Sequence, residues 1–361
     1  MTTTTAAPTT TTKAYVIDKA GAEPTLQTIT LAALGPDEVE IDMRYCGLCL
    51  TDCHMQNNDW GISTYPMVAG HEGTGVVSKV GTRVTDLKVG DAVGIGWIRN
   101  SCKQCDACLG GKDNLCGAYY QGTYLGENAG SWGRGGCELQ GCFAKVMHID
   151  ARFAFKLPAG FALDAGAPLL CAGITVWEPI VDYVKPGTQL GVVSLGGLGH
   201  MAVKLGAAVG AEVTVLSSSA NKAKQSAELG AHHFVQYTCQ GELEACAAKL
   251  DVIIDTCPAN VGLDAILGCL KFGGTYVRVG IPHKEAQTVS IGLIPLIFTG
   301  KKIAGSIVSG PANTNAMLRL AASHNIACDV KVVPFTELAS TMDALAKGET
   351  EGHFRYVMKW D

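Results

Sequence analysis

The sequence lacks features that would place it in other classes of protein: a targeting segment, a long apolar run and an excess of positive charge. Residues 1–12 are mostly threonine, without the apolar core of a secretion signal or the arginines of an organelle transit peptide, and we expect a disordered tail. No apolar run reaches the length of a membrane span. The formal net charge of −5 argues against nucleic acid or an anionic membrane as a partner.

Cysteine and glycine, by contrast, are abundant. Fifteen cysteines without a secretion signal indicate a reducing compartment, by default the cytosol, where clustered thiols serve metals or catalysis. Forty-four glycines indicate tight turns and at least one close approach of the backbone to a ligand. With 361 residues, 47% of them hydrophobic, the chain is long enough for two domains.

The stretch 46–72 concentrates thiols, imidazoles and carboxylates among small residues. Zinc prefers this mixture of ligands, and a catalytic zinc keeps three protein ligands so that its fourth position stays open. We interpret Cys49 and His71 as two of these ligands, with Cys171 as the best candidate for the third. The alternative is that they are ordinary buried cysteines and a core histidine.

A second group of thiols has the most specific spacing in the sequence: Cys102, Cys105, Cys108 and Cys116. Four thiolates this close together can surround one zinc ion completely, which is typical of a structural site. Iron–sulfur clusters also use closely spaced cysteines, but with a different last spacing that proline usually follows. The pattern therefore predicts a structural zinc site that stabilises a long loop.

The first part of the chain is rich in short strands separated by glycines. We expect these strands at residues 39–43, 75–80 and 89–96. Their alternation and their turns predict a compact, barrel-like β domain. A helix at about 312–324 and a strand at 354–359 indicate that the chain returns to this domain at its end.

Beyond residue 190, buried strands alternate with helices. The expected strands are 191–195, 212–216, 251–255 and 275–279. This alternation predicts an α/β fold with a doubly wound parallel sheet.

A glycine-rich turn joins the first of these strands to a helix, the context in which such a turn binds the pyrophosphate of a dinucleotide. Its residues are Ser194, Leu195, Gly196, Gly197, Leu198 and Gly199. Serine replaces the first glycine of the usual pattern, and the turn tolerates it if no positive φ is needed there. The alternative is a strand–helix turn that binds no ligand.

The second strand ends without the acidic residue that binds the ribose 2′-hydroxyl of NAD. Three hydroxyls and a cation stand there instead, from Ser217, Ser218, Ser219 and Lys222. Because these groups suit a phosphate, we predict NADP(H). A serine-rich helix cap with a solvated lysine is the alternative, and it leaves the missing acid unexplained.

Together these motifs resemble the zinc-dependent medium-chain alcohol dehydrogenases, and most closely their cinnamyl-alcohol-dehydrogenase branch. The family's zinc signature matches segment 70–81 (Gly-His-Glu-x2-Gly-x5-Gly), and the resemblance runs from about Lys13 to the C-terminus. It implies a GroES-like, β-rich catalytic domain at 13–171 and 310–361, split around a Rossmann domain at 172–309. It also implies a homodimer, with one catalytic and one structural zinc in each chain.

Position by position, the resemblance implies roles for further residues. Glu72 would stand beside the catalytic zinc as an outer or transient ligand, and Thr51, His54 and Asp59 would form a proton relay. Thr51 would also contact the cofactor. The other implied cofactor contacts are Thr175, Thr256, Gly280, Ser306, Ile307 and Val308.

The implied reaction is a reversible transfer of hydride between NADPH and an aldehyde carbon, with zinc polarising the aldehyde oxygen. Thr51 would protonate the resulting alkoxide, and His54, which titrates near neutrality, would resupply the proton. Taken alone, His54 is more simply interpreted as a surface histidine in a loop.

The chain departs from the family near the pyrophosphate and in the substrate pocket. Leu50 replaces a histidine or arginine that many relatives carry near the pyrophosphate. Gln121 falls near the position where lignin-pathway enzymes have a tryptophan, while Trp60 and Trp97 either line the pocket or belong to the core. We therefore predict a broad NADPH-dependent aldehyde reductase acting on cinnamyl-type or other aldehydes.

Two other functions stay open. One is a medium-chain reductase for another polarised double bond, such as an iminium or an activated alkene, and the other is a non-catalytic NADPH-binding protein. Either divergence should show as lost relay residues or lost zinc ligands, and all of these are present. A function in zinc storage or nucleic-acid binding is disfavoured, because it fits neither the negative charge nor the presence of a second, dinucleotide-binding domain.

Overall fold

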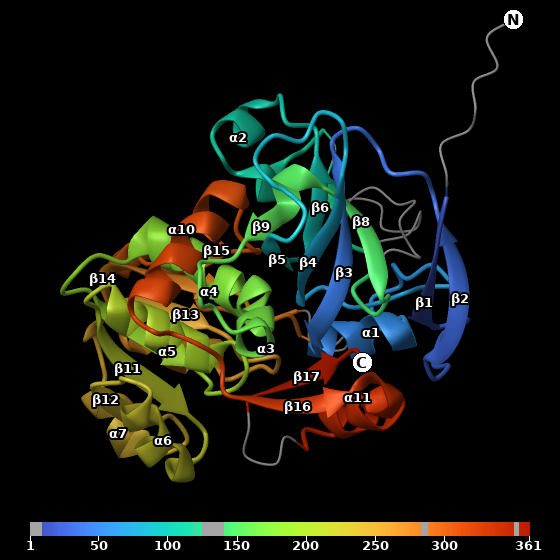
Figure 1. The fold of residues 1–361 in the computed structure, drawn as a ribbon. Coiled ribbons are helices and arrows are strands. Elements are labelled where there is room, and N and C mark those ends of the chain that lie inside the picture. The colour runs from blue at the N-terminus through green and yellow to red at the C-terminus, as the bar shows by residue number, and fades with distance from the viewer. Residues whose placement is uncertain (1–8, 119, 125–140, 283–287, 350–353) are drawn as a thin grey trace, which may run out of the picture. The chain divides into compact units, whose positions relative to one another are not determined.

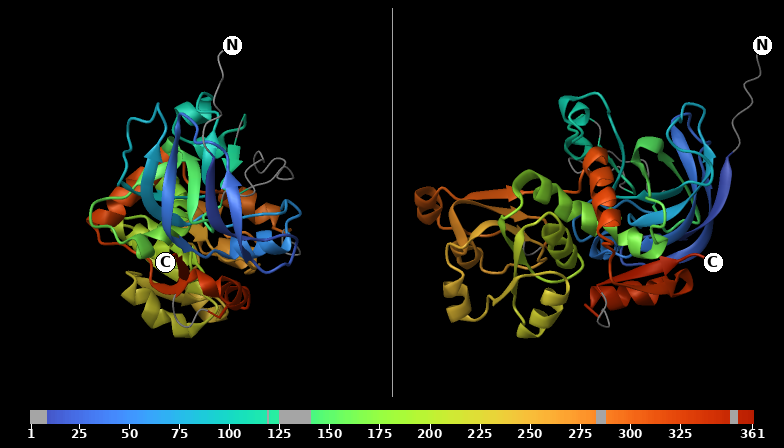
Figure 2. Two further views of the ribbon diagram at one scale, coloured as in Figure 1. Left: turned by 45° about the vertical axis from the view of Figure 1, so that its right-hand side comes forward. Right: turned by 60° about the vertical axis from the view of Figure 1, so that its left-hand side comes forward.

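The computed structural model describes residues 9–118, 120–124, 141–282, 288–349 and 354–361, which form two compact units (Figures 1 and 2). Unit 1 consists of the described residues up to Cys171 together with 310–318 and 327–361. Unit 2 consists of 172–309 and 319–326.

Unit 1 is built on a seven-stranded mixed sheet with the order β16-β17-β3-β4-β5-β9, in which β8 also pairs with β3. Its strands are β3 (Glu38–Gly47), β4 (Gly73–Val80), β5 (Ala92–Ile95), β8 (Val146–Asp150), β9 (Ala154–Lys156), β16 (Val330–Pro334) and β17 (Arg355–Lys359). Two smaller sheets pair β1 (Thr10–Val16) with β2 (Thr25–Leu31) and β6 (Ile98–Ser101) with β7 (Tyr120–Gly122).

The expected strands of this part are confirmed, with one shortened. Residues 39–43 lie within β3 and 75–80 within β4, but the segment expected at 89–96 is extended only over β5. Gly90 has a φ of +93° and belongs to a turn in which the Asp91 N–H donates to the Lys88 carbonyl oxygen, so the strand cannot begin earlier.

The helices of unit 1 are short. They are α1 (Leu50–Asn57), α2 (Asp106–Leu109), α3 (Leu163–Gly166) and α11 (Leu338–Ala346), with the first part of α10 (Pro311–Ser323). The last strand, β17, pairs antiparallel with the end of β3, where Val357 lies opposite Gly47. The end of the chain therefore completes the sheet beside the segment that leads into α1.

Unit 2 contains a six-stranded parallel sheet with the order β12-β11-β10-β13-β14-β15 and helices on both of its faces (Figures 1 and 2). Its strands are β10 (Gln189–Val193), β11 (Glu212–Ser217), β12 (His233–Gln236), β13 (Leu250–Asp255), β14 (Leu270–Arg278) and β15 (Lys302–Gly305). Its helices are α4 (Ala172–Tyr183), α5 (Gly199–Ala208), α6 (Ala223–Glu228), α7 (Gln240–Ala245), α8 (Leu263–Gly268) and α9 (Leu293–Thr299).

Counted from β10, this strand order is 3-2-1-4-5-6, the arrangement of the dinucleotide-binding doubly wound fold. The sequence-based expectation of an α/β fold with a parallel sheet is confirmed. In the part of the chain that the structure describes, none of the helices combines the length and the apolar character needed to cross a bilayer.

Candidate active site

Four potential metal ligands come together in unit 1, from Cys49, His71, Glu72 and Cys171. Their ligand atoms all lie within 4.8 Å of one another, and all four residues are buried. Cys49 immediately precedes α1, the histidine and glutamate immediately precede β4, and Cys171 follows a 3₁₀ turn at the end of the unit's first segment. The structure thus brings together the residues that the sequence indicated for a catalytic zinc.

Asp52 orients the histidine of this cluster. Its Oδ1 lies 3.1 Å from His71 Nδ1, and its Oδ2 accepts a hydrogen bond of 3.0 Å from the backbone N–H of Cys49. Because a carboxylate only accepts, His71 Nδ1 carries the proton and Nε2 keeps its lone pair. That nitrogen lies 3.3 Å from Cys171 Sγ, inside the cluster.

Glu72 is fully buried, and neither of its carboxylate oxygens accepts a hydrogen bond from a described residue. Gly47 leaves the room for it, since a Cβ there would lie 2.1 Å from the Glu72 oxygen. Arg355 Nη1, from β17, lies 3.6 Å from the carboxylate. Burial raises the pKa of Glu72 to about 8, although the charge of Arg355 opposes this. A buried acid without hydrogen bonds, next to two thiols and an imidazole, suits a cation.

The two thiols of the cluster differ in their electrostatics. The hydrogen bond from Cys171 lowers the pKa of Cys49 well below its ordinary value against the effect of burial, and the charge of Arg355 contributes. The same contact and burial raise the pKa of Cys171. Zinc binds the thiolate form, so Cys49 already favours the form that a metal requires.

The expected relay residues lie on and just after α1. Thr51 and His54 are three positions apart in the helix, which places their side chains on the same face. Asn58 ends the helix with a φ of 58°, and the returning chain brings Asp59 Oδ2 to 2.7 Å from His54 Nδ1. His54 is buried rather than a surface residue, which contradicts the simpler interpretation of this histidine.

Two half-buried tryptophans adjoin these groups. The ring centroids of Trp60 and His54 lie 5.0 Å apart, and those of Trp97 and His71 lie 5.2 Å apart in an edge-to-face arrangement. Gln121, the third residue assigned to the pocket, lies on β7 in the pairing register opposite Asn100. A pocket-lining role for all three stays a prediction.

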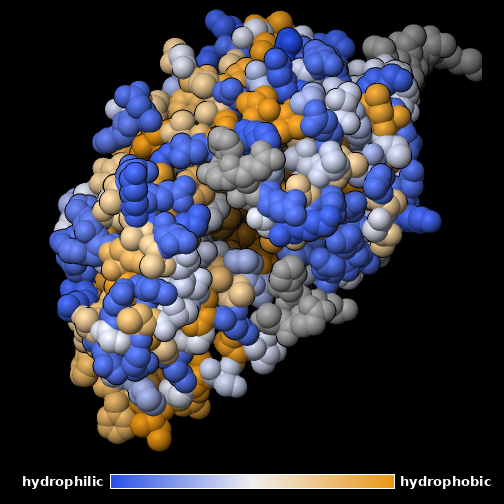
Figure 3. All heavy atoms as spheres, turned by 90° about the horizontal axis from the view of Figure 1, so that it is seen from below, coloured by the Kyte–Doolittle hydropathy of each residue, from blue (hydrophilic) through white to orange (hydrophobic). Residues whose placement is uncertain are grey.

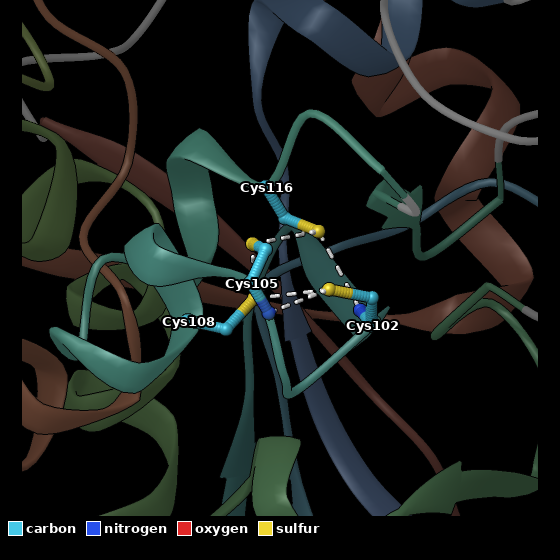
Figure 4. A group of neighbouring side chains, drawn as sticks. All are labelled: Cys102, Cys105, Cys108 and Cys116. Atoms are coloured by element: carbon cyan, nitrogen blue, oxygen red, sulfur yellow. Dashed lines mark hydrogen bonds between the residues drawn. The ribbon is translucent and has the colours of Figure 1, made fainter.

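The four cysteines of the second group surround a common point (Figure 4). Their Sγ atoms are 3.8 Å apart between Cys102 and Cys108, 3.5 Å between Cys105 and Cys108, and 3.9 Å between Cys105 and Cys116. A tetrahedron with zinc–sulfur bonds of 2.3 Å has edges of about 3.8 Å. The geometry therefore fits one zinc ion with four thiolate ligands. Backbone N–H groups of Gln104 and Cys105 lower the pKa of Cys102 to about 6.

The segment that carries these cysteines, residues 102–116, is called the cysteine lobe below. A buried carboxylate within it, that of Asp113, anchors it to β6. Asp113 accepts hydrogen bonds from Ser101 Oγ at 2.7 Å and from Arg152 Nε and Nη2 at 3.1 and 2.9 Å. Arg152 also donates to the Cys108 carbonyl oxygen at 3.3 Å. These hydrogen bonds tie the lobe to β6 and to the 3₁₀ turn that contains Arg152.

The residues expected to hold the dinucleotide lie in unit 2, apart from Thr51. Most follow the carboxyl ends of its strands, which share one edge of the parallel sheet, where such folds bind dinucleotides. Residues 194–199 follow β10, 217–219 end and follow β11, Thr256 follows β13, Gly280 follows β14, and 306–308 follow β15, while Thr175 lies on α4.

Ser194 has a φ of +73°, so the condition under which the turn would readily tolerate serine, the absence of a positive φ, is not met. A left-handed conformation costs a non-glycine residue roughly 1–2 kcal/mol. Hydrogen bonds hold the strand end in place, from Ser194 N–H to the Leu216 carbonyl oxygen (2.9 Å) and from Thr256 Oγ1 to the Val193 carbonyl oxygen (2.7 Å). Gly199 is also required, because a Cβ there would lie 2.1 Å from the Ser194 carbonyl oxygen. The backbone of Ser194 is therefore strained, because it adopts a left-handed conformation that normally requires glycine.

Ser218 and Ser219 are exposed after β11, whereas Ser217 is buried. Lys222 ends the following 3₁₀ turn, and its Nζ donates to Gln225 Oε1 at 3.1 Å. Hydroxyls and a cation are thus available in the position where an NAD site has a carboxylate.

Three residues that support the first cluster were not identified from the sequence: Asp52, Tyr124 and Arg355. Asp52 carried a usable signal, because an acidic side chain three residues after the N-cap of a helix can accept a hydrogen bond from the N-cap backbone N–H. Tyr124 Oη donates to Asp52 Oδ1 at 2.8 Å and is fully buried. Neither it nor Arg355 stands in a recognisable motif.

Comparison with known proteins identifies the family. The chain matches the alcohol dehydrogenase GroES-like domain over residues 35–159 and the zinc-binding dehydrogenase family over 197–323. Over 330 residues it is 41% identical to "Probable cinnamyl alcohol dehydrogenase 6" of Oryza sativa subsp. japonica, with 90% of this chain and 89% of that protein covered. It is also 41% identical over 329 residues to a mannitol dehydrogenase of Petroselinum crispum, with 90% and 94% covered.

A solved structure shows the same architecture. The cinnamyl alcohol dehydrogenase from Helicobacter pylori, complexed with NADP(H), matches with a TM-score of 0.87 and 30% identity, over 98% of this chain and 99% of that chain. The chain therefore belongs to the zinc-dependent medium-chain alcohol dehydrogenases, in their cinnamyl-alcohol-dehydrogenase branch. It combines a GroES-like domain with a Rossmann domain, as expected.

Replacing Cys105 with serine tests the structural role of the cysteine lobe. We expect the zinc content to fall by one ion per chain and the midpoint of thermal unfolding to fall, because the ion contributes folding free energy. A loss of about 2 kcal/mol would lower the midpoint by about 5 °C. Cys239→Ser is the matched control, since this cysteine is exposed and lies outside both clusters. Unchanged zinc content and unfolding in the Cys105 variant would refute the assignment.

Proposed function

We propose that this alcohol dehydrogenase uses NADP(H) to interconvert aldehydes, cinnamyl-type or other, and the corresponding alcohols. The observation that supports this most directly is the buried group of two thiols, an imidazole and a carboxylate within 4.8 Å of one another. In this proposal residues 13–171 and 310–361 form the catalytic domain and residues 172–309 the dinucleotide-binding domain.

Two zinc ions per chain suit the two clusters. Cys49, His71 and Cys171 would hold the catalytic ion, with Glu72 as an outer or transient ligand, and the cysteine lobe would hold the structural one. When bound, the catalytic zinc supplies a Lewis acid for the substrate oxygen, and NADPH supplies the hydride. Thiolate ligands also require a reducing compartment, and we propose the cytosol.

The chain's own residues would carry the proton. Thr51 donates its hydroxyl proton to the substrate oxygen, and His54 restores it. A threonine hydroxyl is a weak acid on its own, so it needs a titratable group behind it. Asp59, at 2.7 Å from His54 Nδ1, fixes the orientation of the ring and, with a side chain that is 33% exposed, links it to solvent.

The end of β11 favours NADP(H) over NAD(H). Segment 217–222 contains three serines and a lysine and no acid, and two of these serines are exposed. A carboxylate at this place would repel a 2′-phosphate, whereas hydroxyls and a cation can bind it. The Helicobacter pylori relative, which was solved with NADP(H), supports the same choice.

The residues beside the centre favour an aromatic substrate without restricting the enzyme to one. Trp60 packs against the relay histidine and Trp97 against a candidate metal ligand, and these contacts support a role for both in binding the substrate. The relatives named for cinnamyl alcohol and for mannitol indicate that the branch accepts different alcohols. The retained relay argues against an iminium or alkene reductase and against a non-catalytic protein.

Unit 2 has a surface suited to a second copy of this chain. Helix α9 exposes four apolar side chains: Leu293 (62%), Ile294 (72%), Ile297 (73%) and Phe298 (83%). The neighbouring β15 is an edge strand with unpaired backbone groups, and residues 288–300 contain no charge. A space-filling view shows hydrophobic residues reaching the surface at its lower left (Figure 3). Two copies related by a twofold axis could pair these edges and cover α9, which supports a homodimer.

Turnover with a panel of cinnamyl, benzyl and aliphatic aldehydes tests the proposed reaction. We expect oxidation of NADPH in preference to NADH, and loss of turnover after zinc chelation. The order of kcat/KM values among the aldehydes would show how Trp60, Trp97 and Gln121, the predicted lining of the pocket, affect substrate preference. Tight NADPH binding with two zinc ions per chain but no turnover of any aldehyde would contradict the proposal.

Replacing Lys222 with alanine together with Ser218 by aspartate tests the choice of coenzyme. A hydrogen bond to a charged group contributes about 1.5–3 kcal/mol, so the ratio of kcat/KM for NADPH to that for NADH should fall by about tenfold or more. Lys224→Ala is the control, because this lysine is exposed and pairs with Glu228. An unaltered ratio would show that the 2′-phosphate is bound elsewhere.

Placing glutamates at Ile294 and Phe298 tests the dimer. In a twofold-symmetric dimer the new carboxylates of one copy would face those of the other, and their repulsion should prevent association. We therefore expect the variant to be a folded monomer and the wild type a dimer, measured by sedimentation. Val89→Glu is a control, since this residue is 60% exposed in unit 1. A double variant that remains dimeric, or a monomeric wild-type protein, would exclude this interface.

A further inference from the structure

Tyr124 lies just after β7 and is fully buried. Its hydroxyl donates a hydrogen bond of 2.8 Å to Asp52 Oδ1. Its ring packs against two other aromatic groups, with centroids 5.9 Å from His71 and 5.6 Å from Trp97, the latter edge-to-face. The residue therefore contacts the metal centre through two kinds of interaction, a hydrogen bond from its oxygen and van der Waals contact from its ring.

The hydrogen bond matters because of the position of Asp52. Oδ1 accepts from three groups, the Gly70 N–H (3.1 Å), His71 Nδ1 (3.1 Å) and the Tyr124 hydroxyl (2.8 Å). The hydroxyl forms the shortest of the three, and a hydrogen bond from a hydroxyl to a carboxylate is among the stronger types. Without it, Asp52 would accept hydrogen bonds only from the backbone N–H groups of Cys49 and Gly70 and from His71, the residue whose ring it orients.

We propose that Tyr124 is a positioning residue for the catalytic metal: its hydroxyl fixes the Asp52 carboxylate, which in turn directs His71 Nε2 toward the cluster. The inference rests on the proposed metal site at Cys49, His71 and Cys171. Groups behind a metal ligand set its orientation and basicity, and their loss typically weakens metal binding about 10–100-fold. Tyr124 stands one step further out, so we expect an effect of about tenfold.

Tyr124→Phe separates this role from simple packing, because it keeps the ring and removes only the oxygen. Tyr120→Phe is the matched control, since it removes the same atom, also buried, from a half-buried tyrosine on β7 whose hydroxyl is not among the donors to Asp52. The measurement is competition between the holoenzyme and a chromophoric zinc chelator, which follows the two zinc ions separately. The cysteine lobe serves as an internal reference.

We expect Tyr124→Phe to bind one of its two zinc ions about tenfold more weakly, with the other ion, NADPH binding and the unfolding midpoint close to those of the wild type. The value of kcat/KM for an aldehyde should fall with the occupancy of that ion, and saturating zinc should restore it. Tyr120→Phe should match the wild type in zinc affinity.

Zinc affinity within about twofold of the wild type in Tyr124→Phe would overturn the inference, because a hydroxyl that fixes the carboxylate behind a metal ligand should have a larger effect. Equal weakening of both ions together with a lowered unfolding midpoint would also overturn it, since the effect would then be general loosening. A wild-type protein that holds zinc only in the cysteine lobe would instead refute the proposed catalytic site itself, so the two failures are distinguishable.

Discussion

One buried carboxylate, that of Asp52, connects the parts of the chain that form the candidate metal centre. It accepts hydrogen bonds from the backbone of Cys49 and Gly70, from the ring of His71 and from the hydroxyl of Tyr124. An ionised carboxylate is costly to bury unless such donors compensate for the lost water. Because these donors come from three separate segments, the carboxylate fixes their relative positions, and the distances within the cluster depend on it.

A second buried carboxylate, that of Glu72, contrasts with the first. It has the charge of Arg355 nearby at 3.6 Å, but within the described residues it accepts no hydrogen bond. The centre therefore combines one buried carboxylate that accepts four hydrogen bonds from the protein with another that accepts none from the described residues. Since the ionised form of a buried acid without hydrogen bonds is unfavourable, the second acid indicates where a cation would contribute most to stability.

The sequence revealed the parts of the site whose chemistry is distinctive. Thiols at close spacing have few roles in a reducing compartment, so residue type and spacing were enough to predict metal ligands at Cys49 and in the cysteine lobe. Strand alternation likewise predicted the parallel sheet. The strain at Ser194 could not be predicted, because backbone φ is set by the neighbouring strands and not by the local sequence. Tyr124 and Arg355 could not be found either, because common residues become informative only once folding brings them beside Asp52 and Glu72.

The discontinuity of unit 1 has a consequence for the order in which the protein is made. The parallel sheet of unit 2 is complete before β16 and β17 have been synthesised. Until residues 355–359 leave the ribosome, the end of β3 is paired on one side only, with β4, and Glu72 lacks the cation of Arg355. The cysteine lobe, contained within residues 102–116, could therefore bind an ion early in synthesis, whereas the pairing of Arg355 with Glu72 at the candidate metal centre has to await β17.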